Sequence, residues 1–435
     1  MIQGMPDQLG KALAGGALAA ALIASGAPAS AQDGTLKVGI VAFLSGPAAG
    51  PFGVPARNAA ELLIEHINEG TMPAPYDSAG VAGLKIQAVY IDEAGGTTTQ
   101  VTEMRNLVQR ENVDAIIGYI SSGSCLAVAP VAEELQVLTV FFDCGTPRTF
   151  EEASYKYVFR TQPHATMDSV GAARYVKDKL GDVSTYAGIN QNYAWGQDSW
   201  RDFVLAMKTL FPEAKVSTEL FPKLFAGEYG SEISALLVSN SDTLHSSLWG
   251  GDLESFVFQS LTRGLPQRTP MVLTTAETAM FRLKDQLPDG TIVGARGPNG
   301  VLAHDTELNR WFQETFTDRY GTPPVYSAYH MAHAVLGLKS AFDKAAEAKG
   351  GAPTTDEVIA AFENLTFESM GQTLEMSLGN GHQAVGETAY GTYKFDNGTP
   401  TIVDVIRYPA KCVNPPEGTT SIEWLEAGMP DAECG

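Results

Sequence analysis

The serines that follow a short apolar segment are the side chains of this sequence best placed to do chemistry. Ser121, Ser122 and Ser124 lie between a predicted strand that ends near Tyr119 and a predicted helix. A serine nucleophile needs a base, and none stands near these residues in the sequence. Their hydroxyls, with the free N–H groups at the start of the helix, would suit an anion or a carboxylate. Capping of that helix is the structural alternative, and one loop can do both.

Signatures of catalysis are absent from the sequence. It contains no GxSxG elbow, no GxxxxGK(S/T) loop, no GxGxxG after a strand, no HExxH and no calcium-loop pattern. His330 and His333 have a spacing that could hold a metal, but no acidic or cysteine ligand lies nearby, so we interpret them as packed or half-exposed histidines. We expect no catalytic residue, no bound metal and no cofactor, and therefore no enzyme.

The N-terminus has the pattern of a signal peptide over residues 1–31. An unbroken run of small and apolar residues from Ala12 to Ile23 follows Lys11, and Ala29-Ser30-Ala31 is a small-x-small cleavage site that would leave Gln32 first. The run is shorter than the roughly 20 residues that span a bilayer, and no later segment is long enough. We expect an exported protein that is cleaved near Ala31 and is not embedded in the membrane.

Composition excludes one class of partner and sets the number of domains. The chain has 29 basic and 50 acidic residues and a formal charge of −21. Removal of residues 1–31 takes away one Asp and one Lys, so the mature chain keeps that charge. Nucleic acid is excluded as a partner, because phosphate backbones need clustered Lys and Arg. The length exceeds what one hydrophobic core usually serves, so we expect two domains.

Four cysteines fall into two pairs whose members lie about twenty residues apart. An oxidising compartment makes disulfides the default interpretation of such pairs in an exported chain. We expect Cys125 to bond Cys144 and Cys412 to bond Cys434. Four cysteines allow three pairings, and the sequence does not choose among them.

Strands alternate with helices along most of the chain. This alternation predicts an α/β fold with parallel sheets, covered by helices on both faces and joined by right-handed crossovers. The predicted strands are Leu36–Phe43, Ile86–Ile91, Ala115–Tyr119, Val137–Phe142, Thr185–Ile189, Val216–Phe221, Thr243–Trp249, Met271–Thr274 and Thr291–Ala295. The predicted helices are Ala56–Asn68, Thr98–Glu111, Leu126–Leu135, Thr166–Leu180, Gly196–Leu210, Gly230–Asn240, Leu253–Thr262 and Glu277–Asp285.

Parallel sheets of this kind bind ligands at the carboxyl ends of their strands. The loops that directly follow the predicted strands are therefore the candidates for a binding site. They are rich in Gly, Ser, Thr and aromatic residues, and they begin at Leu44, Ser121, Asp143, Gln191, Gly250 and Thr275.

Short motifs in a fixed order give the chain a resemblance to a known family. With these motifs, the chain resembles the branched-chain amino acid class of periplasmic binding proteins, which serve ABC transporters, over essentially the whole mature sequence. Each motif is weak alone, but their order and spacing argue against chance. They are Lys37-Val38-Gly39-Ile40, Leu44-Ser45-Gly46-Pro47, Asn68, Ile91-Asp92-Glu93, Ile117-Gly118 with the serine loop, Thr146-Pro147, Asn190 to Gly196, Leu248 to Leu253, Tyr320 to Pro324, and His382-Gln383-Ala384.

The resemblance implies the type I periplasmic binding protein fold, with two doubly wound Rossmann-like lobes around a central ligand cleft. It also implies a periplasmic protein, expected to be a monomer, that hands a small molecule to the permease of an ABC transporter. A ligand-sensing receptor module of the same fold is the alternative. The implied ranges are 35–160 with 297–375 for lobe one, 161–296 with 390–412 for lobe two, and 413–435 for an extended C-terminal tail.

The resemblance also implies which residues touch the ligand. The serine loop and the loop after the next strand would hold a carboxylate, aromatic residues would close the cleft, and an acidic residue of lobe two would take an ammonium group. Glu277 matches the acidic position best, and Asp252 is the rival. The implied ligand-binding residues are Phe52, Ser122, Gly123, Cys144, Gly145, Thr146, Trp195, Asp252 and Glu277.

The chain departs from the pattern of the family in ways that concern the ligand. Amino acid binders of this class often have a disulfide at the positions that Gly95 and Ser121 occupy here, and Cys125 with Cys144 would substitute for it. Asp143 adds a negative charge where small residues are expected. Bulky tryptophans at positions 195 and 249 favour a flat ligand as much as a branched one, unless they only pack the core. An amino acid, an amide and an aromatic acid all remain candidates.

Overall fold

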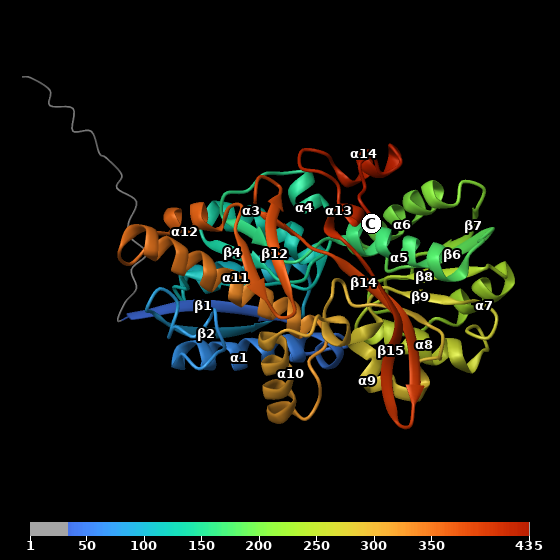
Figure 1. The fold of residues 1–435 in the computed structure, drawn as a ribbon, viewed down its shortest axis with the longest axis horizontal. Helices are drawn as coiled ribbons and strands as arrows, with labels where there is room; N and C mark the ends of the chain where they lie inside the picture. Colours follow the sequence, from blue (N-terminus) through green and yellow to red (C-terminus); the bar gives the residue numbers. More distant parts are fainter. Residues whose placement is uncertain (1–33, 435) are drawn as a thin grey trace, which may run out of the picture.

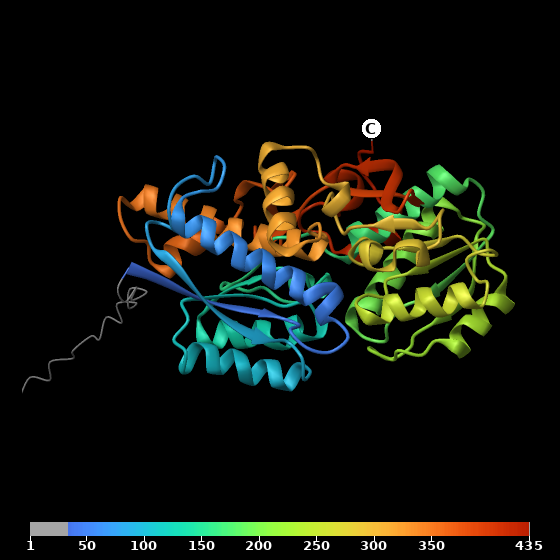
Figure 2. The ribbon, with the colours of Figure 1, turned by 90° about the horizontal axis from the view of Figure 1, so that it is seen from below.

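The computed structural model describes residues 34–434 and divides them between two α/β lobes. The lobes stand side by side, and the C-terminal segment, in red, runs along one edge where they meet (Figure 1). The view turned by 90° also shows the two lobes side by side, each with its own sheet and helices (Figure 2). The predicted fold class of two doubly wound lobes is confirmed. The predicted signal peptide, residues 1–31, lies outside the described residues.

The first lobe is built on an eight-stranded sheet. Its strands are β1 (Thr35–Ala42), β2 (Lys85–Asp92), β3 (Ala115–Gly118), β4 (Leu138–Phe141), β5 (Val158–Arg160), β11 (Thr366–Ser369), β12 (Gln372–Leu378) and β13 (Gln383–Val385). Its helices are α1 (Val54–Glu69), α2 (Thr97–Gln109), α3 (Ser122–Leu135), α4 (Arg148–Glu151), α10 (Glu307–Tyr320), α11 (Tyr326–Lys349) and α12 (Thr355–Phe362). The strand order is β11-β12-β13-β5-β4-β3-β1-β2.

The second lobe is built on a seven-stranded sheet. Its strands are β6 (Thr185–Ile189), β7 (Lys215–Leu220), β8 (Thr243–Ser246), β9 (Met271–Leu273), β10 (Ile292–Gly294), β14 (Thr388–Asp396) and β15 (Thr399–Tyr408). Its helices are α5 (Ala165–Leu180), α6 (Ala194–Leu210), α7 (Gly230–Ser239), α8 (Gly251–Thr262), α9 (Met280–Leu283), α13 (Ala410–Val413) and α14 (Ser421–Glu426). The strand order is β15-β14-β10-β9-β8-β6-β7.

Parallel pairing brings the carboxyl ends of the central strands to one edge of each sheet. In the first lobe β1 pairs in parallel with β2 and with β3, and β3 pairs in parallel with β4. In the second lobe β6, β8, β9 and β10 pair in parallel in the same way. All residues of β3, β4, β8, β9 and β10 are buried, as expected for strands covered by helices on both faces.

The chain passes between the two sheets three times. It leaves the first sheet after β5, returns after β10, and leaves again after β13. Three crossings that lie together form a hinge in two-lobed proteins, because a few residues at the ends of strands can absorb the change in backbone angles. From the order of strands we expect lobes that can rotate about this junction.

Two predicted segments differ in the structure. The predicted helix Glu277–Asp285 is instead a 3₁₀ turn at Ala276–Ala279, the short helix α9, and a second turn at Lys284–Gln286. Helix α14 lies within the segment expected to be an extended tail. That helix packs against α6, with Trp424 buried in the core of the second lobe. Hydrophobic burial therefore fixes this segment to the second lobe.

Both expected disulfides are present, and each serves a different region. Cys125 bonds Cys144, with Cα atoms 6.4 Å apart, and ties α3 to the loop after β4. Cys412 bonds Cys434, with Cα atoms 4.7 Å apart, and closes the C-terminal segment on itself. The first bond lies beside the predicted ligand loop, and the second lies at the end of the chain.

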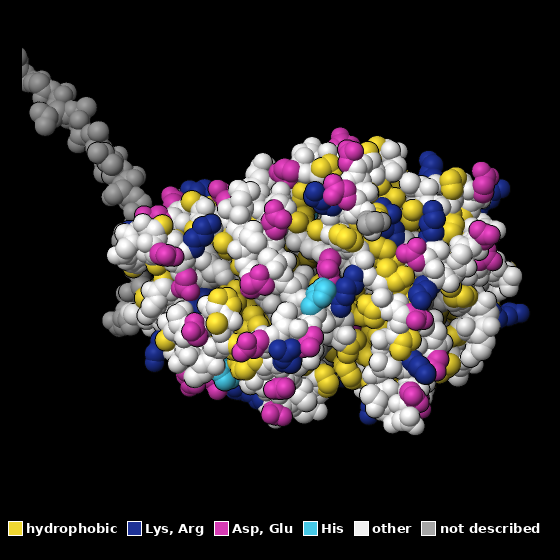
Figure 3. All heavy atoms as spheres, viewed as in Figure 1, with side chains coloured by type: hydrophobic (Ala, Val, Ile, Leu, Met, Phe, Trp, Pro, Cys, Tyr) yellow, Lys and Arg dark blue, Asp and Glu magenta, His cyan; other side chains and the backbone are white. Residues whose placement is uncertain are grey.

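The surface is mixed in charge on the visible face. Acidic and basic side chains are scattered across it, without a continuous basic area (Figure 3). Within residues 34–434, we find no helix whose length and apolar character would let it cross a membrane.

Candidate functional site

A small cavity lies between the lobes, at the carboxyl ends of their strands. Its volume of ≈ 10 Å³ admits about one water molecule. The first lobe contributes the loops after β1, β3 and β4 and the start of α11, and the second contributes the loops after β6, β8, β9 and β10. The lining residues are Phe52, Ile120, Ser122, Asp143, Gly145, Tyr193, Trp195, Trp249, Thr275, Arg296 and Tyr326.

The lobes are closed over this cavity. The Gly251 N–H, at the start of α8, donates to the Pro47 carbonyl of the other lobe at 2.9 Å. The Trp249 ring packs against Phe52, with ring centroids 5.4 Å apart. Glu277 accepts a hydrogen bond of 2.7 Å from the backbone N–H of Tyr326. Apolar and polar contacts both bridge the lobes, so the lobes are in direct contact around the cavity in this conformation.

Arg296 is the cation of the site. Its guanidinium lies 4.4 Å from the centre of the Trp195 ring. It also pairs with Asp143 and, through Nε at 3.0 Å, with Asp168. Burial of the guanidinium opposes its charge, but the two carboxylates outweigh burial and raise the pKa of Arg296. Arg296 is therefore a fixed cation, held by two acidic residues and an indole face.

Asp143 is the carboxylate that lines the cavity. Its Oδ1 contacts Arg296 Nη1 and His330 Nδ1, the latter at 2.7 Å. Its Oδ2 is buried and has no hydrogen-bond partner among residues 34–434. Burial also raises the pKa of Asp168, the second partner of Arg296, to about 7. The side chains of Asp143 and Asp168 are each 1% exposed, so both charges lie in a region of low dielectric.

Two histidines of α11 support Asp143 from behind. His330 Nδ1 faces Asp143, and burial lowers the pKa of His330. His333 Nδ1 contacts Ser369 Oγ at 2.6 Å, and its Nε2 contacts Asn299 at 3.0 Å. Both rings are buried, which agrees with their interpretation as packed histidines. They orient polar groups and do not line the cavity.

Aromatic rings form most of the cavity wall, and hydrogen bonds fix several of them. Trp249 Nε1 donates to Tyr193 Oη at 2.8 Å. Trp195 Nε1 donates to the Ser247 carbonyl at 2.9 Å. The Phe52 and Tyr326 rings meet edge to face, with centroids 5.2 Å apart. Rings held in this way give a ligand flat, apolar contact surfaces with little loss of side-chain freedom.

Four of the nine residues predicted to bind ligand line the cavity: Phe52, Ser122, Gly145 and Trp195. Ser122 Oγ accepts hydrogen bonds from the backbone N–H groups of Gly145 and Thr146, both at 3.2 Å. The serine loop and the loop after β4 therefore meet as predicted from parallel pairing. In this conformation, however, the two N–H groups that were expected to hold a carboxylate donate to Ser122.

Three predicted residues of the same loops lie outside the lining. Gly123 is half-buried in the first turn of α3. Cys144 is buried in its disulfide with Cys125. Thr146 turns its hydroxyl toward Asp198 and donates to it at 2.7 Å. These residues shape the loops that carry Ser122 and Gly145.

Neither acidic residue predicted for lobe two lines the cavity. Asp252 accepts from Gln191 Nε2 and from the Phe225 N–H, both at 2.7 Å, so its carboxylate holds the loops of its own lobe. Glu277 contacts the start of α11, and burial raises its pKa to about 8. The ammonium contact expected of Glu277 or Asp252 stays a prediction; in this conformation Asp252 and one oxygen of Glu277 accept hydrogen bonds from protein N–H groups.

Sequence reasoning did not single out four residues of the lining: Ile120, Tyr193, Arg296 and Tyr326. Arg296 directly follows a predicted strand, so the rule that selected the other loops could have found it. Tyr193 lies inside a quoted motif, but only its neighbour Trp195 was singled out. Tyr326 begins α11 and reaches the cavity from a distant part of the chain, and nothing in the sequence marks that approach.

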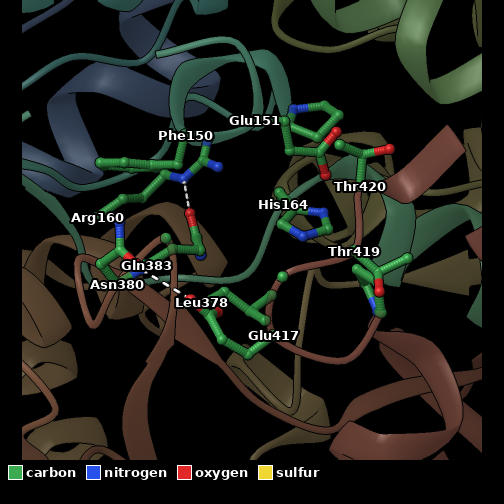
Figure 4. A pocket seen from close by; sticks show the side chains of 14 residues that line it. Phe150, Glu151, Arg160, His164, Leu378, Asn380, Gln383, Glu417, Thr419 and Thr420 are labelled. Atoms are coloured by element: carbon green, nitrogen blue, oxygen red, sulfur yellow. Dashed lines mark hydrogen bonds between the residues drawn. The ribbon is translucent and has the colours of Figure 1, made fainter. Parts of the chain in front are cut away.

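A larger pocket, of ≈ 220 Å³, lies away from the cleft under the C-terminal segment. Arg160 and Phe150 stand at one side of this tail pocket, and Glu151, Thr419 and Thr420 stand at the other (Figure 4). The dashed line from the Arg160 side chain in the figure is its hydrogen bond to Gln383. The tail pocket is thus made by the first lobe and by the segment that the second disulfide closes.

Metal ligands do not gather in either place. Among residues 34–434, no three His, Cys, Asp or Glu side chains are grouped so that they could hold a metal ion.

Comparison with known proteins places this geometry in a family. The family model described as "Periplasmic binding protein" matches residues 35–399. A curated relative, Leu/Ile/Val-binding protein homolog 4 of Brucella abortus, is 28% identical over 253 residues, which cover 55% of this chain and 56% of that relative. The Leu/Ile/Val-binding protein of Escherichia coli is 22% identical and aligns over 65% of this chain and 72% of its own length.

Solved structures share the fold. A solute-binding protein of an ABC transporter from Rhodopseudomonas palustris, in complex with benzoate, has a TM-score of 0.74 and 19% identity, and covers 89% of this chain and 99% of its own. The closed form of a Brucella ovis protein that binds leucine, isoleucine, valine, threonine and alanine has a TM-score of 0.73 and 20% identity, with 88% and 97% covered. At such identities the likeness is one of fold.

Proposed function

The chain belongs to the periplasmic binding protein family, and from this premise we propose that it captures a small solute and delivers it to an ABC transporter. It is a binding protein and not an enzyme. Comparable proteins carry branched-chain amino acids or benzoate, according to their names. The classes of solute proposed from the resemblance are amino acids, amides and aromatic acids.

One observation carries the proposal: the cavity is lined from both lobes. Ser122 and Asp143 come from the first lobe, and Trp195, Trp249 and Arg296 come from the second. A ligand in contact with both sets stabilises the closed state and does so only while the lobes are together. Closure would then report to the transporter that the site is loaded. A cavity with room for one water molecule must widen by rotation at the hinge before it admits a solute.

We propose that Phe52, Ser122, Gly145 and Trp195 contact the solute directly. Their support is their place in the lining and their origin in loops that follow strands. Gly123, Cys144 and Thr146 are proposed to act indirectly, by holding those loops. The mature protein is proposed to start at Gln32, to work in the periplasm as a monomer, and to dock on the permease with both lobes.

A thermal-shift screen tests the proposed function. Amino acids, amides, aromatic acids and amines are each added to the unliganded protein, and the midpoint of unfolding is measured. A true ligand at 100 times its dissociation constant adds about 2.7 kcal/mol to the stability of the protein. Small-angle scattering should then find a more compact particle with ligand than without. A screen in which no class of solute raises the midpoint would contradict the function.

A further inference from the structure

The buried charges around the cavity do not balance. Asp143 and Asp168 face one guanidinium, that of Arg296, and all three side chains are at most 4% exposed. Burial lowers the pKa of His330, the other partner of Asp143, so that its ring does not supply the missing positive charge. Above about pH 7, where Asp168 is ionised, two carboxylates and one cation leave one negative charge in excess. An excess charge in a water-poor site is costly unless a partner neutralises it.

One oxygen atom of Asp143, a residue that lines the cavity, has no partner among residues 34–434. Arg296 and His330 both approach Asp143 through Oδ1. The other oxygen, Oδ2, is buried and accepts no hydrogen bond from residues 34–434. A carboxylate has about four acceptor positions, and buried polar atoms are nearly always paired. The unpaired oxygen of a cavity-lining carboxylate therefore calls for a donor that the ligand brings.

The site offers little to a carboxylate ligand. The N–H groups of Gly145 and Thr146 already donate to Ser122 Oγ. Arg296 already faces two carboxylates. A ligand anion beside Asp143 would add a third negative charge to that group, and like charges at close range in a low dielectric repel strongly.

The walls of the cavity suit a cation. Phe52, Tyr193, Trp195, Trp249 and Tyr326 all line it. The negative face of an aromatic ring attracts an ammonium or guanidinium group within about 6 Å. Trp195 already holds a cation in this way, since the Arg296 guanidinium lies 4.4 Å from its ring centre. The remaining rings present the same kind of surface toward the space beside Asp143.

We infer that the ligand is a compact protonated amine, whose N–H group donates to Asp143 Oδ2 between the aromatic walls. This inference rests on the proposed function and adds protonated amines to the classes of solute proposed there. It moves the acidic contact from lobe two to the loop after β4. It also distinguishes this cleft from a binding site for a simple aromatic acid. A carboxylate on the ligand is not required, because the cation and the rings supply the recognition.

Matched pairs of compounds test the inference by titration calorimetry. Benzylamine and benzoate have nearly the same shape and opposite charge, and so do ethylamine and propanoate. We expect the amine of at least one pair to bind at least tenfold more tightly than its carboxylate partner. A carboxylate that binds as tightly as its amine, or more tightly, would overturn the inference and leave the proposed transport function standing. Failure of every solute class in the thermal-shift screen would instead overturn both.

Two substitutions locate the contact. Asp143→Asn keeps the shape but removes the charge, and charge-assisted hydrogen bonds contribute about 1.5–3 kcal/mol, so amine affinity should fall at least tenfold. Asp202→Asn is the matched control, because it removes a buried carboxylate of α6 that does not line the cavity, and affinity should stay within twofold. An unchanged affinity in Asp143→Asn, or a tenfold loss in Asp202→Asn, would contradict the assignment.

A third substitution keeps the test valid if Asp143→Asn does not fold. Trp249→Leu removes an indole wall that three other rings contact, without changing any charge. Amine affinity should fall about threefold or more, because a cation–π contact in a desolvated site is worth roughly 1–2 kcal/mol. Binding of a neutral compound of the same shape, such as benzyl alcohol, should fall less. Equal losses for the two compounds would overturn the inference.

Discussion

The cleft and the tail pocket differ in size and in what their charged groups do. The cleft holds about one water molecule, whereas the tail pocket has ≈ 220 Å³. In the tail pocket, Arg160 Nη1 donates to the carbonyls of Cys144 and Thr146 at 2.8 and 2.7 Å, and its Nη2 alone has no partner among residues 34–434. Glu151 accepts the backbone N–H of Ser421 at 2.9 Å. These charges hold the chain together.

This difference teaches that volume is a poor guide to function in a two-lobed protein. A closed cleft is small because its walls have met, and its ligand enters only when the lobes part. Convergence of loops from both lobes marks the cleft more clearly than size does. The tail pocket is larger because a polar segment bridges over it and does not fill it.

The largest expected effect is a loss of stability on removal of the disulfide in the C-terminal segment, without a loss of binding. Replacing Cys412 and Cys434 together by Ser should destabilise the protein by about 3 kcal/mol, the entropic value for a closed loop of this length. Ligand affinity should stay within twofold, because the bond lies far from the cleft lining. Thermal unfolding and calorimetry measure the two quantities. A tenfold loss of affinity would mean that the tail takes part in binding.

The next largest effect concerns two glycines, Gly123 of the serine loop and Gly145 of the loop after β4. A Cβ on Gly145 would meet Trp195 Cζ3 at 2.3 Å and Arg296 Nη2 at 2.5 Å. Gly145→Ala must therefore displace the cation and the indole, and overpacking of this kind costs about 1–3 kcal/mol. We expect affinity to fall tenfold or more.

Gly123→Ala is the control for that substitution. Its Cβ would meet no atom closer than 3.6 Å, so affinity and stability should both be retained. An affinity of Gly145→Ala as high as that of Gly123→Ala would show that the cleft tolerates movement of Trp195 and Arg296.

A smaller effect depends on pH and involves Glu277. Burial raises the pKa of Glu277 in the folded protein to about 8, compared with its ordinary value of 4.5. The protonated form is favoured by folding, so its contribution to stability is full below pH 4.5 and is lost as pH rises through 8. Glu277→Gln mimics the protonated form. At pH 9 the free energy of unfolding of the variant should exceed that of the wild type by about 1 kcal/mol or more. At pH 4.5 the two proteins should have the same stability.

Measurement of unfolding at several pH values decides this prediction. A wild type that gains stability over Glu277→Gln between pH 4.5 and 9 would mean that the carboxylate is ionised and paired in the folded protein. Glu93 does not disturb the comparison, although burial also raises its pKa to about 8, because both proteins contain it.

The smallest expected effect is a change in the tail pocket itself. Glu417 lies at the rim and accepts the Asn380 N–H at 3.0 Å. Glu417→Gln keeps an acceptor there, and surface substitutions of this kind usually change stability by less than about 0.5 kcal/mol. Ligand affinity should be unchanged by calorimetry. A loss comparable to that of Gly145→Ala would assign the ligand to the tail pocket.

The sequence predicted the fold and the loops of the site because both follow from local patterns. Alternation of strands and helices determines parallel pairing, and parallel pairing brings Ser122 and Gly145 together. The start of α11 could not be placed in this way, because contacts between distant segments decide where Tyr326 lies. Glu277 matched a family position, but a 3₁₀ turn in place of the predicted helix carries it toward α11.

Asp143 shows which property could be recognised in the sequence and which required the structure. Its charge was recognisable in the sequence as unusual, since small residues were expected there. Its role was not, because that role depends on Arg296 and His330 meeting one oxygen and leaving the other free. Hydrogen-bond partners from three separate elements cannot be read from the spacing of residues.

A crystal structure of the protein with the tightest-binding solute of the screen tests the central claim most directly. We predict ligand density between the lobes, with an amine nitrogen within hydrogen-bond distance of Asp143 Oδ2 and rings of Phe52 and Trp249 against the rest of the molecule. Density in the tail pocket beside Arg160 and Thr419, with the cleft unchanged and without ligand, would contradict it.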